Sequence, residues 1–349
     1  MFRIDMLPAD DGDCLWVEYG TDRAPKRILI DGGRLSTFDI LSERIKRIEG
    51  ERRFELFVIS HYDNDHVDAA VKLLNSAGSL ELKIDEVWFN EWQHLPSDEL
   101  GPREAEYAGT LIERDGLALN QCFEGQAVML DENSPLRPVE LPGGMRLTLL
   151  SPRRIELAKL RKEWAKVVAK PGDREAALRE LAGKKRYADE LGAPMPNVKA
   201  LAEEPTKIDH SVPNGSSIAF LAEFEGKRCL FGADAHPTVL AESLSRLGTE
   251  KGRVVVDAYK VSHHGSKYNT TRALLDQLSC HKYLISTSGK LHGHPDDEGI
   301  ARLIWYGGTN PELYFNYESP QTRVWEGGRL QRKYHYKAFL PPAGASVRL

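Results

Sequence analysis

Six consecutive residues of this chain hold four side chains that bind metal ions well. Residues 61–66 read His-Tyr-Asp-Asn-Asp-His, two imidazoles and two carboxylates in one short segment. Clustered carboxylates repel one another and resist burial, so a divalent cation among them would remove a large cost. His61 and Asp63 lie two residues apart in an extended turn and can converge on one ion. Asp65 and His66, at the start of a helix, can reach a second, which predicts a two-metal site.

A buried strand and an amphipathic helix are expected on either side of this segment. Residues 56–59 form an apolar run typical of a short buried strand, and Val67, Val71 and Leu74 recur at the spacing of one helix face. The simpler interpretation is a solvated turn in which Asp65 caps the helix. A lone aspartate would favour that interpretation. The complete cluster, directly after a buried strand, favours metal binding.

The segment resembles the signature of the metallo-β-lactamase fold superfamily, His-x-His-x-Asp-His, in a variant with Asp at the third position. That variant is similar to the hydrolase domain of the ComEC-type bacterial competence DNA-internalisation protein. Asp63 supplies an oxygen ligand where the signature has nitrogen, which makes the site harder and more tolerant of manganese beside zinc. The resemblance therefore implies two divalent metal ions, Zn or Mn.

Turns near the N-terminus also match this family. Gly12 and Asp13 match a Gly-x-Gly-Asp turn, and residues 31–33 match an Asp-Gly-Gly run that follows a strand beside the metal centre. Without the family, Asp-Gly-Gly is weak evidence, because glycine pairs end strands routinely. With it, these glycines are expected to let the backbone approach the site closely.

Two later strand ends carry further ligand candidates. The apolar run before Gly232 leads to Asp234, and the run 254–261 leads to His263 and His264. In the resemblance, Asp234 matches the aspartate that bridges both metals, and Ser-His-His-Gly-Ser matches the last ligand motif. One histidine of the pair is expected to complete the second metal while its neighbour lies behind it. The following glycine favours His264 as the ligand, and His263 stays open.

One ligand of the superfamily has no clear match. The superfamily often places a histidine upstream of the bridging aspartate, and here that position falls near Asn214. His210 is a nearby substitute. Asn214 fits the competence-type pattern better, so it is the first choice as a metal ligand.

A loop after the strand 283–286 is expected to face the substrate. It reads Ser-Gly-Lys-Leu-His-Gly-His-Pro over residues 288–295 and resembles the family's Ser-x-Gly-Lys and His-Pro elements. His294 is expected to stabilise charge on a substrate oxygen or to protonate a leaving group. Lys290 and Ser266 are substrate-binding candidates, Lys290 through phosphate. For Lys290 an ordinary polar loop is an equally good interpretation.

Residues 153–202 interrupt the family pattern with a helical, basic insertion. Its lysines and arginines well outnumber its acidic residues, and Lys184, Lys185 and Arg186 follow one another directly. One interpretation is a helical hairpin whose basic residues face water. The other is a lid beside the active site in which these three residues bind a phosphate backbone, since clustered cations attract polyanions.

Composition limits the class of protein. The chain has 349 residues, long enough for a substantial core, and a net charge of -5, which argues against a protein that coats nucleic acid generally. Four cysteines are scattered without any Cys-x-x-Cys pair, which favours a reducing compartment. The N-terminus alternates like a strand and no stretch approaches roughly 20 apolar residues, so we expect a cytoplasmic protein outside the membrane.

Strands that alternate with helices predict an α/β fold. The resemblance implies one αββα metallo-β-lactamase-like sandwich over residues 1–349, with 153–202 as an insertion and 311–349 as a C-terminal extension. The function predicted is hydrolysis, in which metals bridged by Asp234 activate water that Asp65 orients. By resemblance, the substrate is a phosphodiester of nucleic acid.

Two alternatives stay open, because fold does not fix function. The same site could hydrolyse a small ester, lactone or lactam. In the other alternative, the metal is structural and the protein is a binding subunit with a protein partner.

Overall fold

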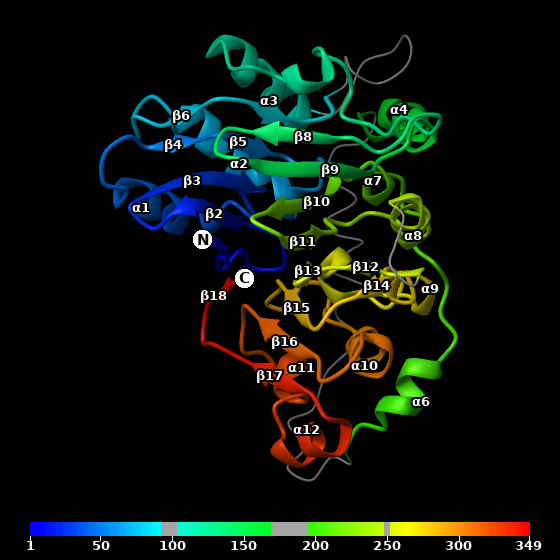
Figure 1. Ribbon diagram of the computed structural model, residues 1–349. Helices are drawn as coiled ribbons and strands as arrows, with labels where there is room; N and C mark the ends of the chain where they lie inside the picture. The colour runs from blue at the N-terminus through cyan, green and yellow to red at the C-terminus, as the bar shows by residue number, and fades with distance from the viewer. Residues whose placement is uncertain (92–102, 169–194, 248–251) are drawn as a thin grey trace.

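The computed structural model describes residues 1–91, 103–168, 195–247 and 252–349. Within them two mixed β-sheets pack face to face (Figure 1). The first sheet has the strand order β18 (Ala345–Arg348), β1 (Phe2–Met6), β2 (Leu15–Thr21), β3 (Ala24–Ile30), β5 (Leu56–Val58), β7 (Val87–Trp88). The second has the order β17 (Lys337–Phe339), β16 (Glu312–Phe315), β15 (Lys282–Ile285), β13 (Ala258–Lys260), β11 (Lys227–Phe231), β10 (Ala219–Phe224), β9 (Met145–Ser151), β8 (Pro138–Leu141).

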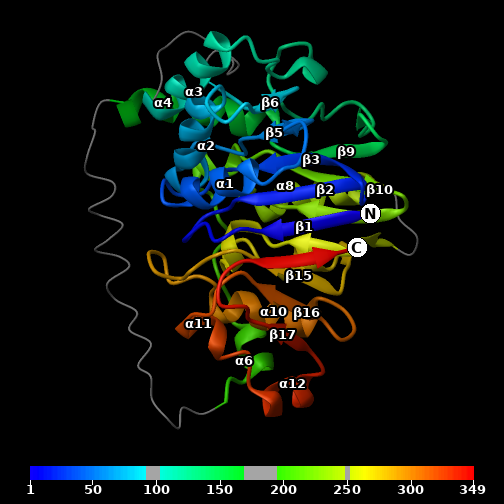
Figure 2. The same ribbon diagram turned by 90° about the vertical axis from the view of Figure 1, so that its left-hand side faces the viewer.

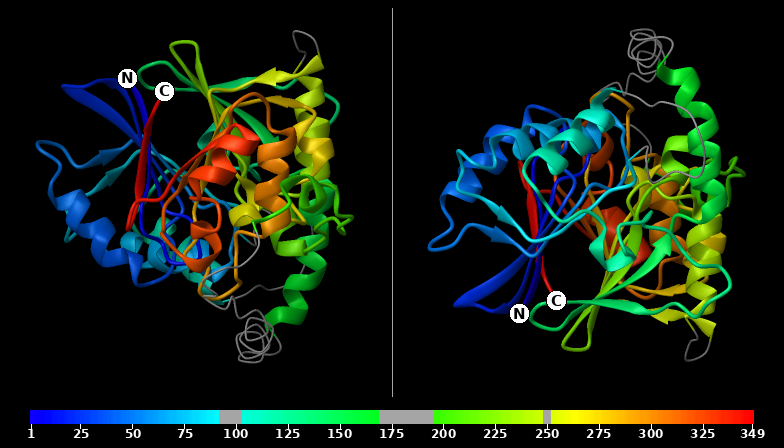
Figure 3. Two further views of the ribbon diagram at one scale, coloured as in Figure 1. Left: turned by 90° about the horizontal axis from the view of Figure 1, so that it is seen from below. Right: turned by 90° about the horizontal axis from the view of Figure 1, so that it is seen from above.

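Helices cover the outer face of each sheet, and alternation along the strands explains why. In β5, Phe57 packs among residues of the covering helices, whereas Leu56 and Val58 pack between the sheets. On the second sheet, Tyr283 faces the helices and Leu284 faces the other sheet. Both faces of these strands are therefore buried, each large apolar side chain contributing about 1.5–3 kcal/mol. The four layers are visible in Figure 3.

The first sheet is covered by α1 (Thr37–Lys46), α2 (Asn64–Ser76) and α3 (Arg103–Arg114), with α4 (Arg154–Val168) packed on the same core. The second is covered by α8 (Pro237–Arg246), α9 (Arg272–Leu275) and α10 (Asp297–Tyr306). The αββα sandwich predicted from the sequence is thereby confirmed. The remaining short elements are β4 (Arg53–Phe54), β6 (Lys83–Ile84), η2 (Gln121–Phe123), α6 (Val198–Glu203), α7 (Val212–Gly215), β12 (Val254–Val255), η4 (Ser262–Gly265), β14 (Leu278–Ser279), α11 (Pro320–Arg323) and α12 (Gly328–Tyr334).

The C-terminal residues complete both sheets. Residues 311–349, expected to be an extension, supply β16 and β17 to the second sheet, whereas β18 pairs antiparallel with β1. This pairing brings the two termini side by side (Figure 2). Of the predicted basic insertion, α4 and α6 are helical, and Lys184, Lys185 and Arg186 lie outside the described residues. Among the described helices, none combines the length and apolar character that crossing a bilayer needs.

The run 254–261, expected to form one strand, is divided between two sheets. β12 pairs with β14 in a small sheet, and β13 enters the large sheet between β11 and β15. Asp257 stands at the break: its amide donates to the carbonyl of Arg228, and its carboxylate accepts from the Arg228 amide. These bonds fix the chain at the point where it changes sheet.

Parallel strands direct the chain toward one edge of the sandwich. β3 runs parallel to β5 in the first sheet, as do β11, β13 and β15 to one another in the second. Because parallel strands have their carboxyl ends at the same edge, the loops that follow them gather there. Most candidate ligands of the sequence lie in those loops or, like Asp65 and His66, in the first turn of the following helix, whereas Asn214 lies in α7, before β10.

The turn before β2 packs directly on the start of α2. A Cβ atom added to Gly12 would lie 1.7 Å from the carbonyl oxygen of Asp65, and the amide of Asp13 donates to that same oxygen at 3.3 Å. Only glycine fits this approach without a shift of the backbone.

We predict that Gly12→Ala lowers the free energy of unfolding by about 1–3 kcal/mol, as overpacking does. It should also weaken metal binding, because the backbone of Asp65 must move. Urea unfolding and a zinc titration measure the two effects. Gly78→Ala is the matched control, since a Cβ there meets nothing within 4 Å. Equal behaviour of the two variants would contradict the prediction.

Candidate metal centre

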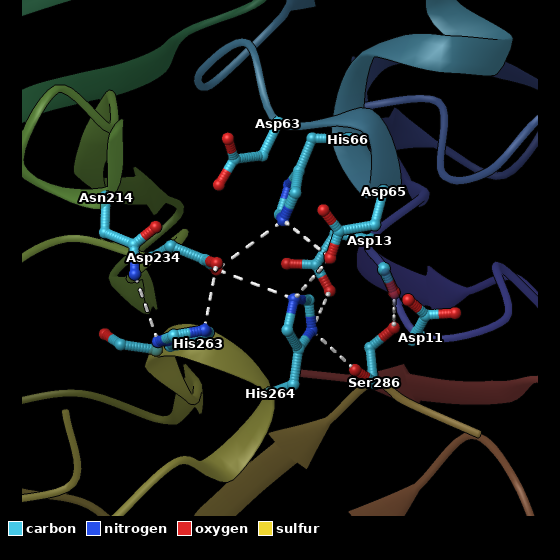
Figure 4. A network of polar contacts seen from close by, with 12 residues as sticks. Asp11, Asp13, Asp63, Asp65, His66, Asn214, Asp234, His263, His264 and Ser286 are labelled. Atoms are coloured by element: carbon cyan, nitrogen blue, oxygen red, sulfur yellow. Dashed lines mark hydrogen bonds and ion pairs between the residues drawn. The ribbon is translucent and has the colours of Figure 1, made fainter. Parts of the chain in front are cut away.

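Asp234 lies at the middle of a group of imidazoles, and its two oxygens face different partners (Figure 4). Its Oδ2 lies 3.8 Å from Nε2 of His61 and 3.8 Å from Nε2 of His263. Its Oδ1 lies 3.6 Å from Nε2 of His66 and 3.7 Å from Nε2 of His264. The two oxygens of this carboxylate therefore face different groups of imidazoles, although His61 and His66 also lie close enough to hold one ion together with Asp234.

Each group contains a further aspartate. Asp63 Oδ2 lies 3.7 Å from His61 Nε2, on the Oδ2 side of Asp234. Asp65 Oδ2 lies 3.8 Å from His66 Nε2 and 3.5 Å from His264 Nε2, on the Oδ1 side. Ligand atoms that surround a zinc ion tetrahedrally at about 2.1 Å are about 3.4 Å apart. The observed pair separations are close to that value. Asp65, His66 and His264 form one compact group that could hold an ion, and His61, His66 and Asp234 form another. Asp63 and His263 belong to no such group within the described residues.

Four buried atoms at the centre of this arrangement accept or donate no hydrogen bond within the described part of the chain. They are Nε2 of His61, His66 and His264, and Oδ1 of Asp234. Buried polar atoms nearly always have a hydrogen-bond partner. These four instead converge, and the same residues belong to clusters able to hold a metal ion. The donor set of nitrogen and carboxylate oxygen fits Zn or Mn.

Hydrogen bonds behind the histidines fix which nitrogen faces the centre. Nδ1 of His66 donates to Asp31 Oδ2 at 2.8 Å, and Nδ1 of His264 donates to the carbonyl oxygen of Ser286 at 2.8 Å. Asp31 in turn accepts from the amide and the hydroxyl of Ser60, at 2.7 Å each. Such partners hold a metal-binding imidazole in place and raise its basicity. The Asp-Gly-Gly turn thus places Asp31 directly behind His66.

Both members of the histidine pair face Asp234, on opposite oxygens. Their backbones are left-handed, with φ of 47° at His263 and 54° at His264. Residues with a side chain adopt this conformation at a cost, and such residues cluster at functional sites. The turn through η4 lets two adjacent side chains face different oxygens of Asp234. The sequence expected one of them to lie behind the other.

Asn214 lies at the site, but its side-chain amide is hydrogen-bonded to a neighbouring carboxylate. Its Nδ2 donates to Asp209 Oδ2 at 2.8 Å and lies 3.2 Å from His263 Nδ1. Asp209 also accepts from Asn269 Nδ2 at 3.0 Å, and Asn269 Oδ1 accepts from His263 Nδ1 at 2.9 Å. This network orients His263. His210 is exposed and belongs to none of the ligand clusters found in the described residues.

Lys260 and Asp13 form a buried ion pair behind the centre. Lys260 Nζ lies 2.6 Å from Asp13 Oδ2, and Asp13 Oδ1 lies 3.5 Å from His264 Nδ1. Burial alone would raise the pKa of Asp13, but Lys260 and His264 hold it well below its usual range. Lys260, Asp209 and Asn269 were not predicted from the sequence. A lysine in the apolar strand β13 was the available signal, because a buried cation needs a partner.

The carboxylates hold protons on the histidines when no metal is bound. Burial opposes protonation, yet Asp234 raises the pKa of His263 to about 9 and that of His264 to about 10. Although burial acts against its ionised form, the pKa of Asp234 lies well below its usual range because of these imidazoles. Positive charge is therefore required here, from protons or from metal ions.

A cavity of 520 Å³ opens onto the centre. His294 and Ser266 line it, whereas Lys290 is exposed and its Nζ lies 3.9 Å from Asp10 Oδ1. The ring of His294 lies 5.2 Å from that of His263, and burial and the nearby imidazoles hold its pKa well below the usual range. Asp63 and Tyr268 also line the cavity. The cavity therefore gives access to Asp65, Asp234, His263 and His264.

Comparisons with known proteins give only distant likenesses. No family model and no curated protein matches the chain. Among solved structures, it is similar to YhfI from Bacillus subtilis, a metallo-β-lactamase fold protein, at 9% identity and a TM-score of 0.44, over 99% of this chain and 98% of that one. Zn²⁺-bound PqqB from Methylobacterium extorquens matches at 11% identity and a TM-score of 0.43, over 100% of both chains.

A variant of CmlA β-hydroxylase matches at 13% identity and a TM-score of 0.40, over 99% of this chain, which spans only 54% of that protein. Likenesses at these identities and TM-scores carry no argument about the reaction. The predicted relation to the ComEC-type hydrolase domain stays a prediction. The case for a reaction rests on the geometry of the site.

We predict that Asp234→Asn lowers the metal content at both positions, because one residue supplies an oxygen to each. Metal analysis of the purified protein by mass spectrometry measures this. Asp276→Asn is the matched control, since that carboxylate is on the surface, where it pairs with Arg253 and Arg272. Unchanged metal content in Asp234→Asn would refute the shared role of the carboxylate.

Metal binding is expected to release protons at neutral pH. The pKa values of about 9 and 10 mean that His263 and His264 are protonated at pH 7 in the metal-free protein. These raised pKa values stabilise the metal-free fold fully below about pH 6.5, and that stabilisation is lost as the pH rises through 9 to 10. Metal affinity should rise over the same interval, because fewer protons must be displaced. Calorimetric titration of Zn²⁺ in buffers of different ionisation enthalpy would show proton release; binding without it would contradict the prediction.

Proposed function

We propose that this protein is a hydrolase that uses two divalent metal ions to cut phosphodiester bonds in nucleic acid. The observation that carries the proposal is the placement of Asp234, whose two oxygens face two groups of buried ligand atoms. When bound, the ions would act as Lewis acids and would lower the pKa of a bound water molecule.

The openness of the site supports catalysis over a structural role. Structural metal sites are closed by protein ligands, whereas catalytic sites keep room for water and substrate. Here five of the proposed ligands line the cavity: Asp63, Asp65, Asp234, His263 and His264. A metal that only stabilised a binding subunit would not need this access.

Individual residues take separate roles in the proposed reaction. Asp65, 3.5 Å from His264 Nε2 and exposed to the cavity, orients the attacking water. His294 has a lowered pKa and is a neutral imidazole at pH 7. A neutral imidazole is a poor proton donor but a good hydrogen-bond donor. Of the two roles predicted for His294, the stabilisation of a substrate oxygen is therefore the better supported.

The lining of the cavity supports a polar, anionic substrate. Leu291 is the exception among lining residues that otherwise carry polar or charged side chains. A small lactone or lactam would gain little from such walls, since ligand pockets for these molecules are largely apolar. Tyr268, which is 42% exposed, offers an aromatic face on which a base can stack. These features favour a nucleotide chain over the small neutral esters.

We predict cleavage of single- or double-stranded DNA or RNA by the purified protein with Mn²⁺ or Zn²⁺. At saturating metal, Asp65→Asn should reduce the rate by about 10²–10⁴-fold, because it loses the group that orients the water. The matched control is Asp276→Asn, and gel analysis of labelled strands gives the rate. Bound metal without cutting of any of the four substrates would exclude a nuclease acting alone. A protein that binds no metal would refute the whole site.

A further inference from the structure

Arg34 is the one lysine or arginine among the described residues that line the cavity. The other charged groups of the lining are imidazoles and carboxylates, the latter from Asp63, Asp65, Asp68, Asp209 and Asp234. Two metal ions would neutralise the aspartates that bind them. Arg34 then remains as a permanent positive charge of the protein beside the reacting groups.

The Gly32–Gly33 turn fixes where Arg34 leaves the backbone. The amide of Gly32 donates to the carbonyl oxygen of His66 at 2.8 Å, and a Cβ on Gly32 would lie 2.1 Å from the amide nitrogen of Ala70. Gly33 has φ of +72°, which glycine adopts readily. The turn thus packs against the first turns of α2, and Arg34 emerges next to the helix that carries Asp65.

Asp11 holds the guanidinium by one edge. Arg34 Nε and Nη2 both donate to Asp11 Oδ2, at 3.3 and 3.0 Å. Asp11 is buried, and the Arg34 side chain is 24% exposed. Nη1 of Arg34 donates to no acceptor in the described part of the chain. The group is therefore oriented in advance, with donor capacity left over in the cavity.

We propose that Arg34 binds a non-bridging oxygen of the substrate's phosphodiester and so selects anionic substrates over neutral esters. This inference rests on the proposed function and identifies the residue that distinguishes anionic from neutral substrates. A guanidinium matches phosphate geometry and keeps its charge at every working pH. Fixing it on Asp11 lowers the entropy lost on binding. Arg34 would thereby recognise the negative charge of the substrate independently of the metal ions.

The test compares Arg34→Met with the unchanged protein, both loaded with metal. For a chromogenic aryl phosphodiester, KM should rise about tenfold or more, as expected for loss of one charged hydrogen bond. Inorganic phosphate should bind about tenfold more weakly in calorimetry, while kcat/KM for a neutral aryl ester stays unchanged. Arg34→Lys should recover part of the phosphate affinity. Arg348→Met, which removes a surface arginine paired with Asp22, is the control.

A second variant separates binding from folding. Arg34→Met leaves the Asp11 carboxylate buried without its cation, so Asp11→Asn is combined with it. If this double variant keeps its melting temperature and metal content yet also keeps the original KM and phosphate affinity, the inference is overturned. Failure of the unchanged protein to cut any phosphodiester would instead refute the proposed function. The phosphate titration still decides the role of Arg34 in that case.

Discussion

The main constraint on this structure is the unfavourable free energy of burying several carboxylates close together. Asp13, Asp31, Asp65 and Asp234 lie around the same imidazoles, and three of the four are fully buried. Like charges this close cannot all stay ionised unless cations lie among them. Lys260 supplies one permanently, through Asp13. The remainder must come from protons or metal ions, so the affinity for cations is a property of the folded chain.

The fold brings these side chains together because the strands that precede them end at the same edge of the sandwich. Asp31 follows β3, His61 follows β5, Asp234 follows β11, and the histidine pair follows β13. Backbone contacts then set the distances between the loops: the amide of Ile218 donates to the carbonyl of Ser60, and that of His263 donates to Ala233. Ligands from both sheets meet because the sheets pack face to face. The core and the site are thus stabilised by the same arrangement.

Local patterns in the sequence predicted the class of fold and most of the residues that the structure brings together around Asp234. A strand that ends in ligand residues can be recognised from a few neighbouring positions in the sequence, as in residues 56–66. Contacts between distant segments carry no such signal. Lys260 faces Asp13, Asp209 holds Asn214 and Asn269, and β18 pairs with β1. The break at Asp257 was missed for the same reason, since it depends on a bond to the backbone of Arg228.

The two oxygens of Asp234 differ in what surrounds them. Around Asp234 Oδ1, the imidazoles of His66 and His264 are fully buried and donate to a carboxylate and a backbone carbonyl. Around Oδ2, His263 is 25% exposed and donates to the neutral amide of Asn269, and Asp209 Oδ2 lies 3.6 Å from the same nitrogen. Both sides therefore have a carboxylate behind an imidazole, and the difference between them is burial, which limits exchange with water. An ion beside Oδ1 would therefore be the more tightly held, and one beside Oδ2 would lie nearer to incoming substrate.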